Sequence, residues 1–262
     1  MENIFLPSKI ELKEEKNSNL AILTVEPLYH GYGTTIGNAL RRVLLSSLPG
    51  AAATAIKIKG APHEFSTLTG IYEDILQIVL NAKQLRLKLY SDEPVILKLV
   101  KKGMGDVLAK DITKDANVEI INPDLKIATI TDKGAELNME ITVEKGRGFE
   151  PTENRSKENL SVGTIAIDSI FTPIKDVGFK VENTRVGQIT NFDKLTLTLE
   201  TDGTISPREA INFSAKILID HFNILVSEAT SAPEAKEGEE KGTKTKRPKT
   251  KKSGKSAKKA KK

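Results

Sequence analysis

The sequence predicts an α+β fold, with strands and helices in an irregular order. Residues 34–48 and 70–84 carry apolar side chains at helical spacing, and a third helical segment begins at Ser206. Between them lie many short segments in which apolar and polar residues alternate, the period of half-buried strands. The resulting order lacks the regular strand–helix alternation of a doubly wound sheet.

The N-terminal part of the chain predicts a strand followed by a helix. Residues 20–26 form a short apolar run that is typical of a strand. The helical spacing over residues 34–48 ends at a Pro-Gly pair, which commonly terminates helices. Thr34 and Thr35 stand at the start of this segment, so we expect a threonine hydroxyl to cap the helix.

The middle of the chain predicts strands around one helix. Residues 56–59 alternate between apolar and polar side chains, and residues 70–84 form the second helical segment. Residues 85–89 and 95–99 alternate on either side of an Asp-Glu-Pro turn, so they predict a β-hairpin. Residues 145–149 carry two glycines like a phosphate-binding loop, but no helical segment follows, so we predict a flexible hairpin or loop.

The last predicted helix has a clear start. Strands at 137–143 and 195–199 precede it, and an Asp-Gly turn follows the second of them. Ser206 stands at the N-cap, Pro207 at the first helical position and Glu209 three residues after the cap, which is the pattern of a capping box. The apolar positions of this helix are Ala210, Phe213, Ile217, Leu218, Ile224 and Leu225.

Residues 229–262 differ from the rest of the chain in charge. They hold 12 Lys and one Arg against four Glu, a formal charge of +9, whereas residues 1–228 hold 27 basic and 31 acidic residues, a charge of −4. This lysine-rich tail has no aromatic residue, so we predict that it is disordered. Two interpretations stay open: a solubilising tail, and a non-specific nucleic-acid contact through counterion release.

Composition excludes several classes of site. The 262 residues include no cysteine, which removes disulfides, thiolate metal sites and cysteine nucleophiles. The three histidines, His30, His63 and His221, have no metal-ligand spacing, and the nucleophile-elbow, zinc-protease and P-loop motifs are missing. We expect no catalytic residue, metal or cofactor in this chain. The sequence shows no signal peptide and no bilayer-length apolar stretch, so we expect a cytoplasmic protein without membrane contact.

The first predicted helix has two different faces. On a helical wheel of about 100° per residue, Ile36, Leu40 and Val43 form one stripe, which we assign to the core or to a dimer. Arg42 and Leu45 fall on the opposite side. An isolated exposed leucine is the plain interpretation of that side. The alternative is a partner contact, where arginine is favoured.

The last helix is also apolar on more than one side. Phe213 and Ile217 belong to its main apolar face with His221, and Ile219 and Phe222 extend that surface around the helix. A helix that is apolar on several sides is buried or lies in an oligomer interface, so two such helices predict a homodimer. We interpret His221 as a core or interface residue rather than a metal ligand.

Several motifs resemble those of bacterial RNA polymerase alpha subunits. The sequence GYGTTIGNALRRVLLSSLPG at residues 31–50 is similar to the first-helix signature of that family. The resemblance covers about residues 1–228. Four further segments follow in the family order: the loop before the second helix at 61–67, that helix at 70–84, the GRG-aromatic-x-P loop at 146–151 and the turn opening the last helix at 202–210.

The resemblance implies an architecture and a set of partners. A discontinuous dimerisation domain, a sheet with two packed helices, would comprise residues 1–49 and 173–228. A mostly β insert domain of residues 50–172 would interrupt it. Family members form homodimers through the first and last helices, and the dimer recruits the beta and then the beta-prime subunit. Those large subunits catalyse transcription, so a member is a non-catalytic scaffold of DNA-directed RNA polymerase, associated with the nucleoid.

Carried onto this sequence, the resemblance places Arg42 and Leu45 at the contact with the beta subunit. Arg41 and Lys83 are further candidates for the same surface. Phe149 stands where the family usually has tyrosine. Most members continue after the last helix into a compact C-terminal domain that binds promoter DNA. The lysine-rich tail shows no such pattern, so we do not expect specific promoter recognition from it.

Two other hypotheses stand beside the scaffold. One is a stand-alone nucleic-acid-binding protein that acts through its tail, and the other is an enzyme with an unrecognised site. The acidic balance of residues 1–228 and the lack of an aromatic-basic motif argue against the first. The lack of any clustered acid, base or nucleophile motif argues against the second.

Overall fold

The computed structural model describes residues 4–15, 19–154, 161, 163–187 and 189–230. The chain divides into two compact units, Met1–Asn223 and Ile224–Lys262. The described part is mostly β with few helices, in the predicted order of elements. The lysine-rich tail lies outside the described residues, apart from its first two residues at the end of the last helix.

An antiparallel sheet of four strands is built from segments far apart in the sequence. Along β14, Leu195, Leu197 and Leu199 are fully buried and the residues between them are half-buried, which confirms the predicted alternation. One face of this sheet therefore packs against helices. In spatial order its strands are β1 (Lys9–Glu14), β2 (Leu20–Leu28), β14 (Ile189–Thr201) and β13 (Ile174–Val186).

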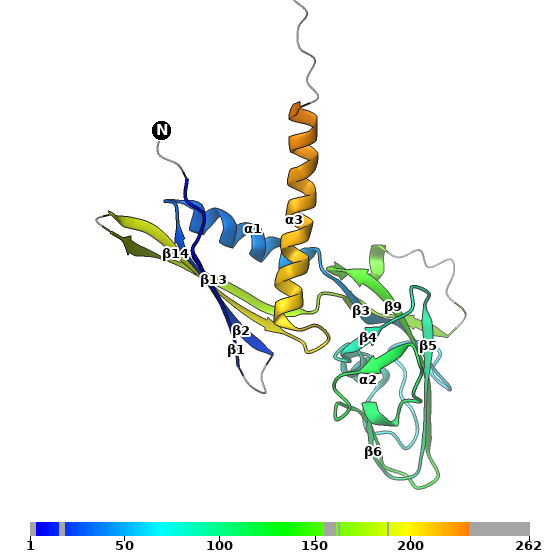
Figure 1. Cartoon of the computed structure of the whole chain (residues 1–262). Coiled ribbons are helices and arrows are strands. Elements are labelled where there is room, and N and C mark those ends of the chain that lie inside the picture. The colour runs from blue at the N-terminus through cyan, green and yellow to red at the C-terminus, as the bar shows by residue number, and fades with distance from the viewer. Residues whose placement is uncertain (1–3, 16–18, 155–160, 162, 188, 231–262) are drawn as a thin grey trace, which may run out of the picture. The chain divides into compact units, whose positions relative to one another are not determined.

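Two helices pack on this sheet. Helix α1 (Tyr32–Ser46) lies along the ribbon formed by β13 and β14 (Figure 1). Helix α3 (Pro207–Thr230) begins with the predicted capping box. The Ser206 hydroxyl accepts from the Glu209 N–H at 3.3 Å, and the Glu209 carboxylate accepts from the Ser206 N–H at 3.2 Å.

A second antiparallel sheet has six strands. Strand β9 (Glu136–Arg147) lies near its centre, and its alternating apolar side chains are fully buried as predicted. The order along the sheet is β5 (Val95–Lys102), β9, β3 (Pro49–Ile58), β4 (Leu87–Leu89) and β7 (Val118–Ile120), while β11 (Thr164–Ala166) pairs with β3.

The predicted β-hairpin of residues 85–89 and 95–99 is wrong. Strand β4 lies between β3 and β7, and all eight residues of β5 pair with β9. The alternation itself was a sound signal, because Leu87, Leu89, Leu97 and Leu99 are all buried. Alternation identifies the face that is buried, but it does not identify the neighbouring strand.

Helix α2 (Ile75–Ala82) is shorter than the predicted helix of residues 70–84. Asp74 is its N-cap and accepts from the Gln77 N–H at 2.7 Å, so the helix begins there rather than at Gly70. Gly70 has a φ of 78°, which a helical residue does not adopt. The buried side chains of α2 are Ile75, Ile78, Val79 and Ala82.

Residues 145–149 are not the predicted flexible hairpin or loop. They form the end of β9 and the start of β10, joined at Gly148 with a φ of 65°. A Cβ atom on Gly146 would lie 2.6 Å from the Phe171 ring, so close packing requires glycine there. The remaining elements are β10 (Phe149–Glu150) paired with β12 (Ser169–Ile170), β6 (Gly105–Leu108) paired with β8 (Lys126–Ile130), and 3-10 turns at Ala109–Asp111 and Thr152–Asn154.

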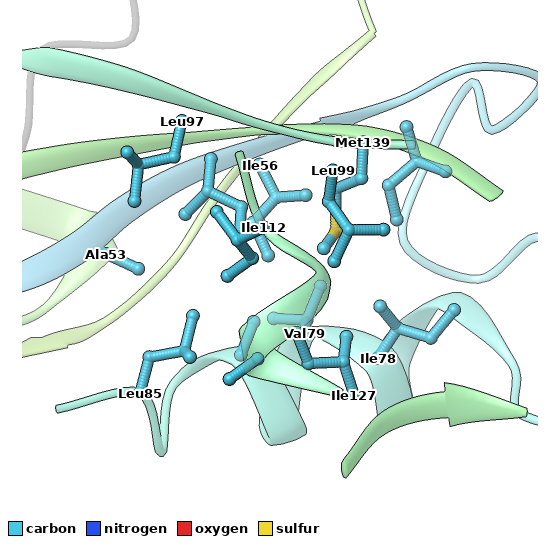
Figure 2. Packing of buried hydrophobic residues seen from close by; sticks show 14 of the residues in the cluster. Ala53, Ile56, Ile78, Val79, Leu85, Leu97, Leu99, Ile112, Ile127 and Met139 are labelled. Carbon is cyan, nitrogen blue, oxygen red and sulfur yellow. The ribbon is translucent and has the colours of Figure 1, made fainter. Parts of the chain in front are cut away.

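Buried apolar side chains form two clusters. One lies in the four-stranded sheet and its helices and draws on residues 23–48 and 174–210. The other lies between the six-stranded sheet and α2 and draws on residues 53–167. Figure 2 shows the second cluster, with Leu99 and Met139 of the sheet facing Ile78 and Val79 of α2.

Candidate protein-interaction site

The buried face of α1 is a line of two glycines and two leucines. Gly33, Gly37, Leu40 and Leu44 are buried, spaced so that they share one side of the helix. A Cβ atom on Gly37 would lie 2.7 Å from the Phe179 ring of β13. Glycine therefore lets the helix backbone approach the sheet closely.

The centre of the buried face of α1 lies about 60° around the helix axis from the centre of the predicted stripe. Leu40 is buried as predicted, and Ile36 and Val43, assigned with it to the core or to a dimer, are half-buried, with Ile36 packed against the core cluster. Leu45, predicted to point outward, is half-buried and packs against the core cluster. The helical wheel assigned the large apolar side chains to the core side. In the structure, the glycines face the sheet.

The two arginines of α1 differ in their contacts. Arg41 Nε donates to the Val177 carbonyl at 3.0 Å, which ties the helix to the edge strand β13. Arg42 lies about 170° from the mean direction of the four buried residues, and it is exposed. Within the described residues, the Arg42 guanidinium has no ion-pair partner. Arg42 is therefore the charge that the outward face of α1 presents to solvent.

Asp193 of β14 caps the N-terminus of α1. Gly31 occupies the N-cap position in a left-handed conformation, with a φ of 83°, and makes no side-chain cap. The buried Asp193 carboxylate instead accepts from the Gly33 N–H at 3.0 Å. The expectation that Thr34 or Thr35 caps the helix is wrong, because both residues lie within the first turn.

Replacing Asp193 by alanine should destabilise the fold. The change removes a helix cap, worth about 0.5–2 kcal/mol, and leaves the Gly33 N–H without its acceptor. We expect the free energy of unfolding to fall by about 2 kcal/mol in urea titrations at fixed protein concentration. Asp193→Asn keeps an acceptor oxygen and should recover most of this loss. Equal instability of the two variants would contradict the capping role.

Lys83 follows α2 and lies beside the segment that joins β9 to β10. Its Nζ is 3.6 Å from Asp168 Oδ2 and 5.8 Å from the centre of the Phe149 ring. Asp168 accepts from the Thr152 N–H at 2.9 Å. This hydrogen bond, with the nearby Lys83 charge, holds the pKa of Asp168 below its ordinary value despite partial burial. Asp168 is therefore ionised at neutral pH and can hold the lysine.

Helix α3 exposes most of its apolar residues. Phe213, Ile219 and Phe222 are 48%, 56% and 59% exposed, and Ile224, Leu225 and Val226 of the second unit are exposed as well. Of the predicted face, Ile217 packs on the core cluster, whereas Phe213 and His221 are exposed. His221 Nδ1 lies 2.7 Å from the Ile217 carbonyl, so this nitrogen carries the hydrogen.

No group of three or more His, Asp or Glu side chains in the described part of the chain is arranged to hold a metal ion. None of the helices described combines the length and the apolar character needed to cross a membrane.

Three features escaped the sequence analysis: the glycine line of α1, the remote cap at Asp193, and the ordered strand that begins at Phe149. The glycine line had a detectable signal, because Gly33 and Gly37 are four residues apart and therefore share a helix face. Asp193 had no detectable sequence signal, because the helix that it caps lies 160 residues earlier in the chain.

The comparisons with known proteins cover most of the chain. A family model described as the RNA polymerase Rpb3/RpoA insert domain matches residues 56–172. The DNA-directed RNA polymerase subunit alpha of Oceanobacillus iheyensis is 52% identical over 219 residues, which are 83% of this chain and 69% of that protein. The subunit of the same name from Symbiobacterium thermophilum is 54% identical over 210 residues, 80% of this chain and 66% of that protein. The chain spans about two thirds of the length of these relatives, and it belongs to the family of DNA-directed RNA polymerase alpha subunits.

Proposed function

We propose that this chain is a non-catalytic subunit of DNA-directed RNA polymerase and acts as a homodimeric scaffold for the beta and beta-prime subunits, at the nucleoid. The observation that carries the proposal is that two opposite sides of α1 have different surroundings. One side packs on the chain's own sheet through Gly33 and Gly37, and the opposite side presents Arg42 to solvent. The names of the relatives supply the polymerase context.

The proposed domain arrangement is a dimerisation domain of residues 1–49 and 173–228, interrupted by an insert domain of residues 50–172. The two clusters of buried side chains support it, because one draws on residues from both outer segments and the other on residues from the middle segment. The insert-domain match at 56–172 agrees with this division.

The proposed dimer interface uses α3 and the flank of α1. Ile219 and Phe222 form an exposed apolar surface on one side of α3 that a second copy would cover, and Phe213 is exposed on the opposite side, which also carries Ile217 and His221. Ile36 and Val43 are half-buried and so retain apolar surface for the same contact. Leu40 and Ile217 belong to the core beneath this interface, and His221 lies at its exposed rim.

The proposed contact with the beta subunit centres on Arg42, and Leu45 contributes the part of its side chain that the core leaves uncovered. The role of Arg41 is to hold α1 on β13, because its guanidinium is engaged there. Lys83, directly after α2, is a further candidate for this contact, and its Nζ lies 3.6 Å from Asp168 Oδ2. Arginine suits such a contact because its planar guanidinium makes paired hydrogen bonds with carboxylates.

Arg42→Ala should weaken binding of the beta subunit about tenfold or more while leaving the dimer intact. The side chain has no ion pair to lose among the described residues, so the fold should be unaffected. Affinity for purified beta subunit and sedimentation of the free variant measure the two effects. The matched control is Arg208→Ala. It removes an arginine at the start of α3 that pairs with Glu14 of β1. Dissociation of the Arg42→Ala dimer would overturn the two-sided assignment of α1.

Co-purification tests the function as a whole. The full chain should elute as a dimer with two very large subunits, and a stable monomer that captures neither would contradict the proposal. Deleting residues 231–262 separates the scaffold from a nucleic-acid-binding protein that works through its tail. Assembly should survive the deletion if the scaffold is correct, and all activity should be lost if the tail is the functional part.

A further inference from the structure

The six-stranded sheet curls until its two end strands line one cavity. Strands β5 and β7 stand at opposite ends of the strand order, yet Leu97 of β5 lines the same space as Val118 and Ile120 of β7. Curling of this kind is how an antiparallel sheet approaches closure into a barrel. The closure is incomplete, and the space between the two strands is a cavity of about 430 Å³. This volume lies within the range of small-molecule sites.

The segment between β6 and β7 covers part of this opening. Ile112 forms a bridge with β5, and the Thr113 N–H donates to the Lys98 carbonyl at 2.8 Å. Near β7 the segment turns back on itself, and the Val118 N–H donates to the Asp115 carbonyl at 3.4 Å. The segment therefore follows the edge of β5, and the cavity lies between it and β7.

The floor of the cavity is apolar. Leu97, Ile112 and Val118 belong to the buried cluster of this sheet, and Ile120 packs against that cluster. Figure 2 shows Leu97 and Ile112 within it. Apolar side chains that line a cavity lack packing contacts on that side, and such cavities take up apolar molecules. The floor therefore favours the apolar body of a ligand.

The rim of the cavity carries charged residues that differ in their contacts. Asp115 accepts from the N–H group two residues later at 2.8 Å, and Glu119 accepts from the Tyr90 hydroxyl at 2.7 Å. Lys110 and Lys114 are exposed, and neither has an ion-pair partner in the part of the chain that the structure describes. The rim thus offers two ammonium groups, whose strongest hydrogen bonds are those to an anionic acceptor such as a carboxylate.

Acidic residues near these lysines are engaged with other groups. Asp111, the neighbour of Lys110, pairs with Lys101 at 2.5 Å and also accepts from the Leu108 N–H at 2.8 Å. Glu119 lies opposite Lys88 in the register of β4 and β7. The positive charge of the rim lysines is therefore available to a ligand.

We propose that this cavity binds a small carboxylic acid with an apolar body. The body packs on Leu97, Ile112 and Val118 between the two end strands, and the carboxylate accepts from Lys110 or Lys114 at the rim. Such a ligand joins β5 to β7 and stabilises the folded sheet, because it binds the native state only. The site does not depend on the proposed polymerase function, since it lies within the six-stranded sheet and its connecting segments.

The test measures binding of octanoate and of 3-phenylpropionate to the full chain by isothermal titration calorimetry. At least one of the two acids should bind at one site per chain and raise the midpoint of thermal unfolding. The tighter of the two shows whether the site prefers a straight or an aromatic body. In a chain labelled at its isoleucine methyl groups, the bound acid should shift the NMR signals of Ile112 and Ile120, and Ile10 of β1 should stay unchanged.

A double variant tests the role of the lysines. Lys110→Gln together with Lys114→Gln should weaken binding of the acid about tenfold, as expected for the loss of a charge-assisted hydrogen bond. Binding of 1-octanol, which has an apolar body without the charge, should not change. The matched control is Lys57→Gln together with Lys133→Gln, which removes two exposed lysines that do not line the cavity. This control should bind the acid like the wild type.

Each outcome decides the proposal. Failure of both acids to bind the wild-type chain would overturn it. Unchanged affinity of the Lys110 and Lys114 double variant, or an equal loss in the control, would overturn the assignment of a carboxylate ligand. Shifts at Ile10 without shifts at Ile112 would place the acid outside the cavity and overturn the site. The scaffold function is judged separately, by whether the chain captures the large subunits.

Discussion

Replacing Gly37 by leucine should separate α1 from its sheet. A Cβ atom there would lie 2.7 Å from the Phe179 ring and 2.9 Å from Leu195, and three further carbon atoms have no room. Overpacking of this kind costs about 1–3 kcal/mol for small additions, and a whole leucine exceeds that range. The gain of about 1 kcal/mol from removing a helical glycine does not offset it. We expect a loss of about 3 kcal/mol or more in the free energy of unfolding, measured in urea at fixed protein concentration.

Gly178→Leu is the control for this prediction. Gly178 lies on β13, beside the same helix, but nothing lies within 4 Å of a Cβ atom placed there. The same substitution should therefore change the free energy of unfolding by less than about 0.5 kcal/mol, as for other surface sites. Equal effects at the two positions would mean that the spacing between α1 and the sheet does not limit stability.

Phe222→Glu should convert the proposed homodimer into monomers at micromolar concentration. Phe222 is 59% exposed in the single chain, so the variant monomer should fold normally. In a dimer the same position would be covered, and an unpaired buried carboxylate is strongly unfavourable. Sedimentation equilibrium of the variant should give the mass of one chain, and circular dichroism should show unchanged secondary structure.

The control for the dimer is a charge on another side of the same helix. Asp220→Lys reverses the charge at an exposed position about 160° from Phe222 around α3, where a dimer should tolerate it. A Phe222→Glu chain that remains dimeric would place the interface elsewhere. The variant also separates assembly steps, because monomers with an intact Arg42 show whether dimerisation must precede binding of the beta subunit.

The elements that the sequence predicted well have strong local signals. The capping box at Ser206 and the alternation along β9 and β14 depend on neighbouring residues, and both are present as predicted. Strand pairing is different. Strand β5 pairs with β9, about 40 residues later in the sequence, rather than with the nearby β4. Such choices depend on the packing of the whole sheet rather than on the local pattern.

The error on α1 has a specific physical cause. A hydrophobic pattern assigns the core to Ile36 and Val43 because their side chains are large. In the structure, close approach between helix and sheet matters more, and Gly33 and Gly37 provide it. The outward position of Arg42 survives the correction, because rotating the helix by about 60° leaves it on the far side. The same rotation moves the Leu45 side chain toward the core cluster, so only part of it stays exposed.

The remote cap of α1 has a consequence for synthesis on the ribosome. The Gly33 N–H finds its acceptor 160 residues later at Asp193, and Arg41 finds its carbonyl 136 residues later at Val177. Contacts between segments so far apart form late, because a long loop must close first. In the nascent chain, α1 therefore has no fixed position until β13 and β14 have emerged from the ribosome. The face that carries Arg42 takes its final position only on chains that have been translated past Asp193.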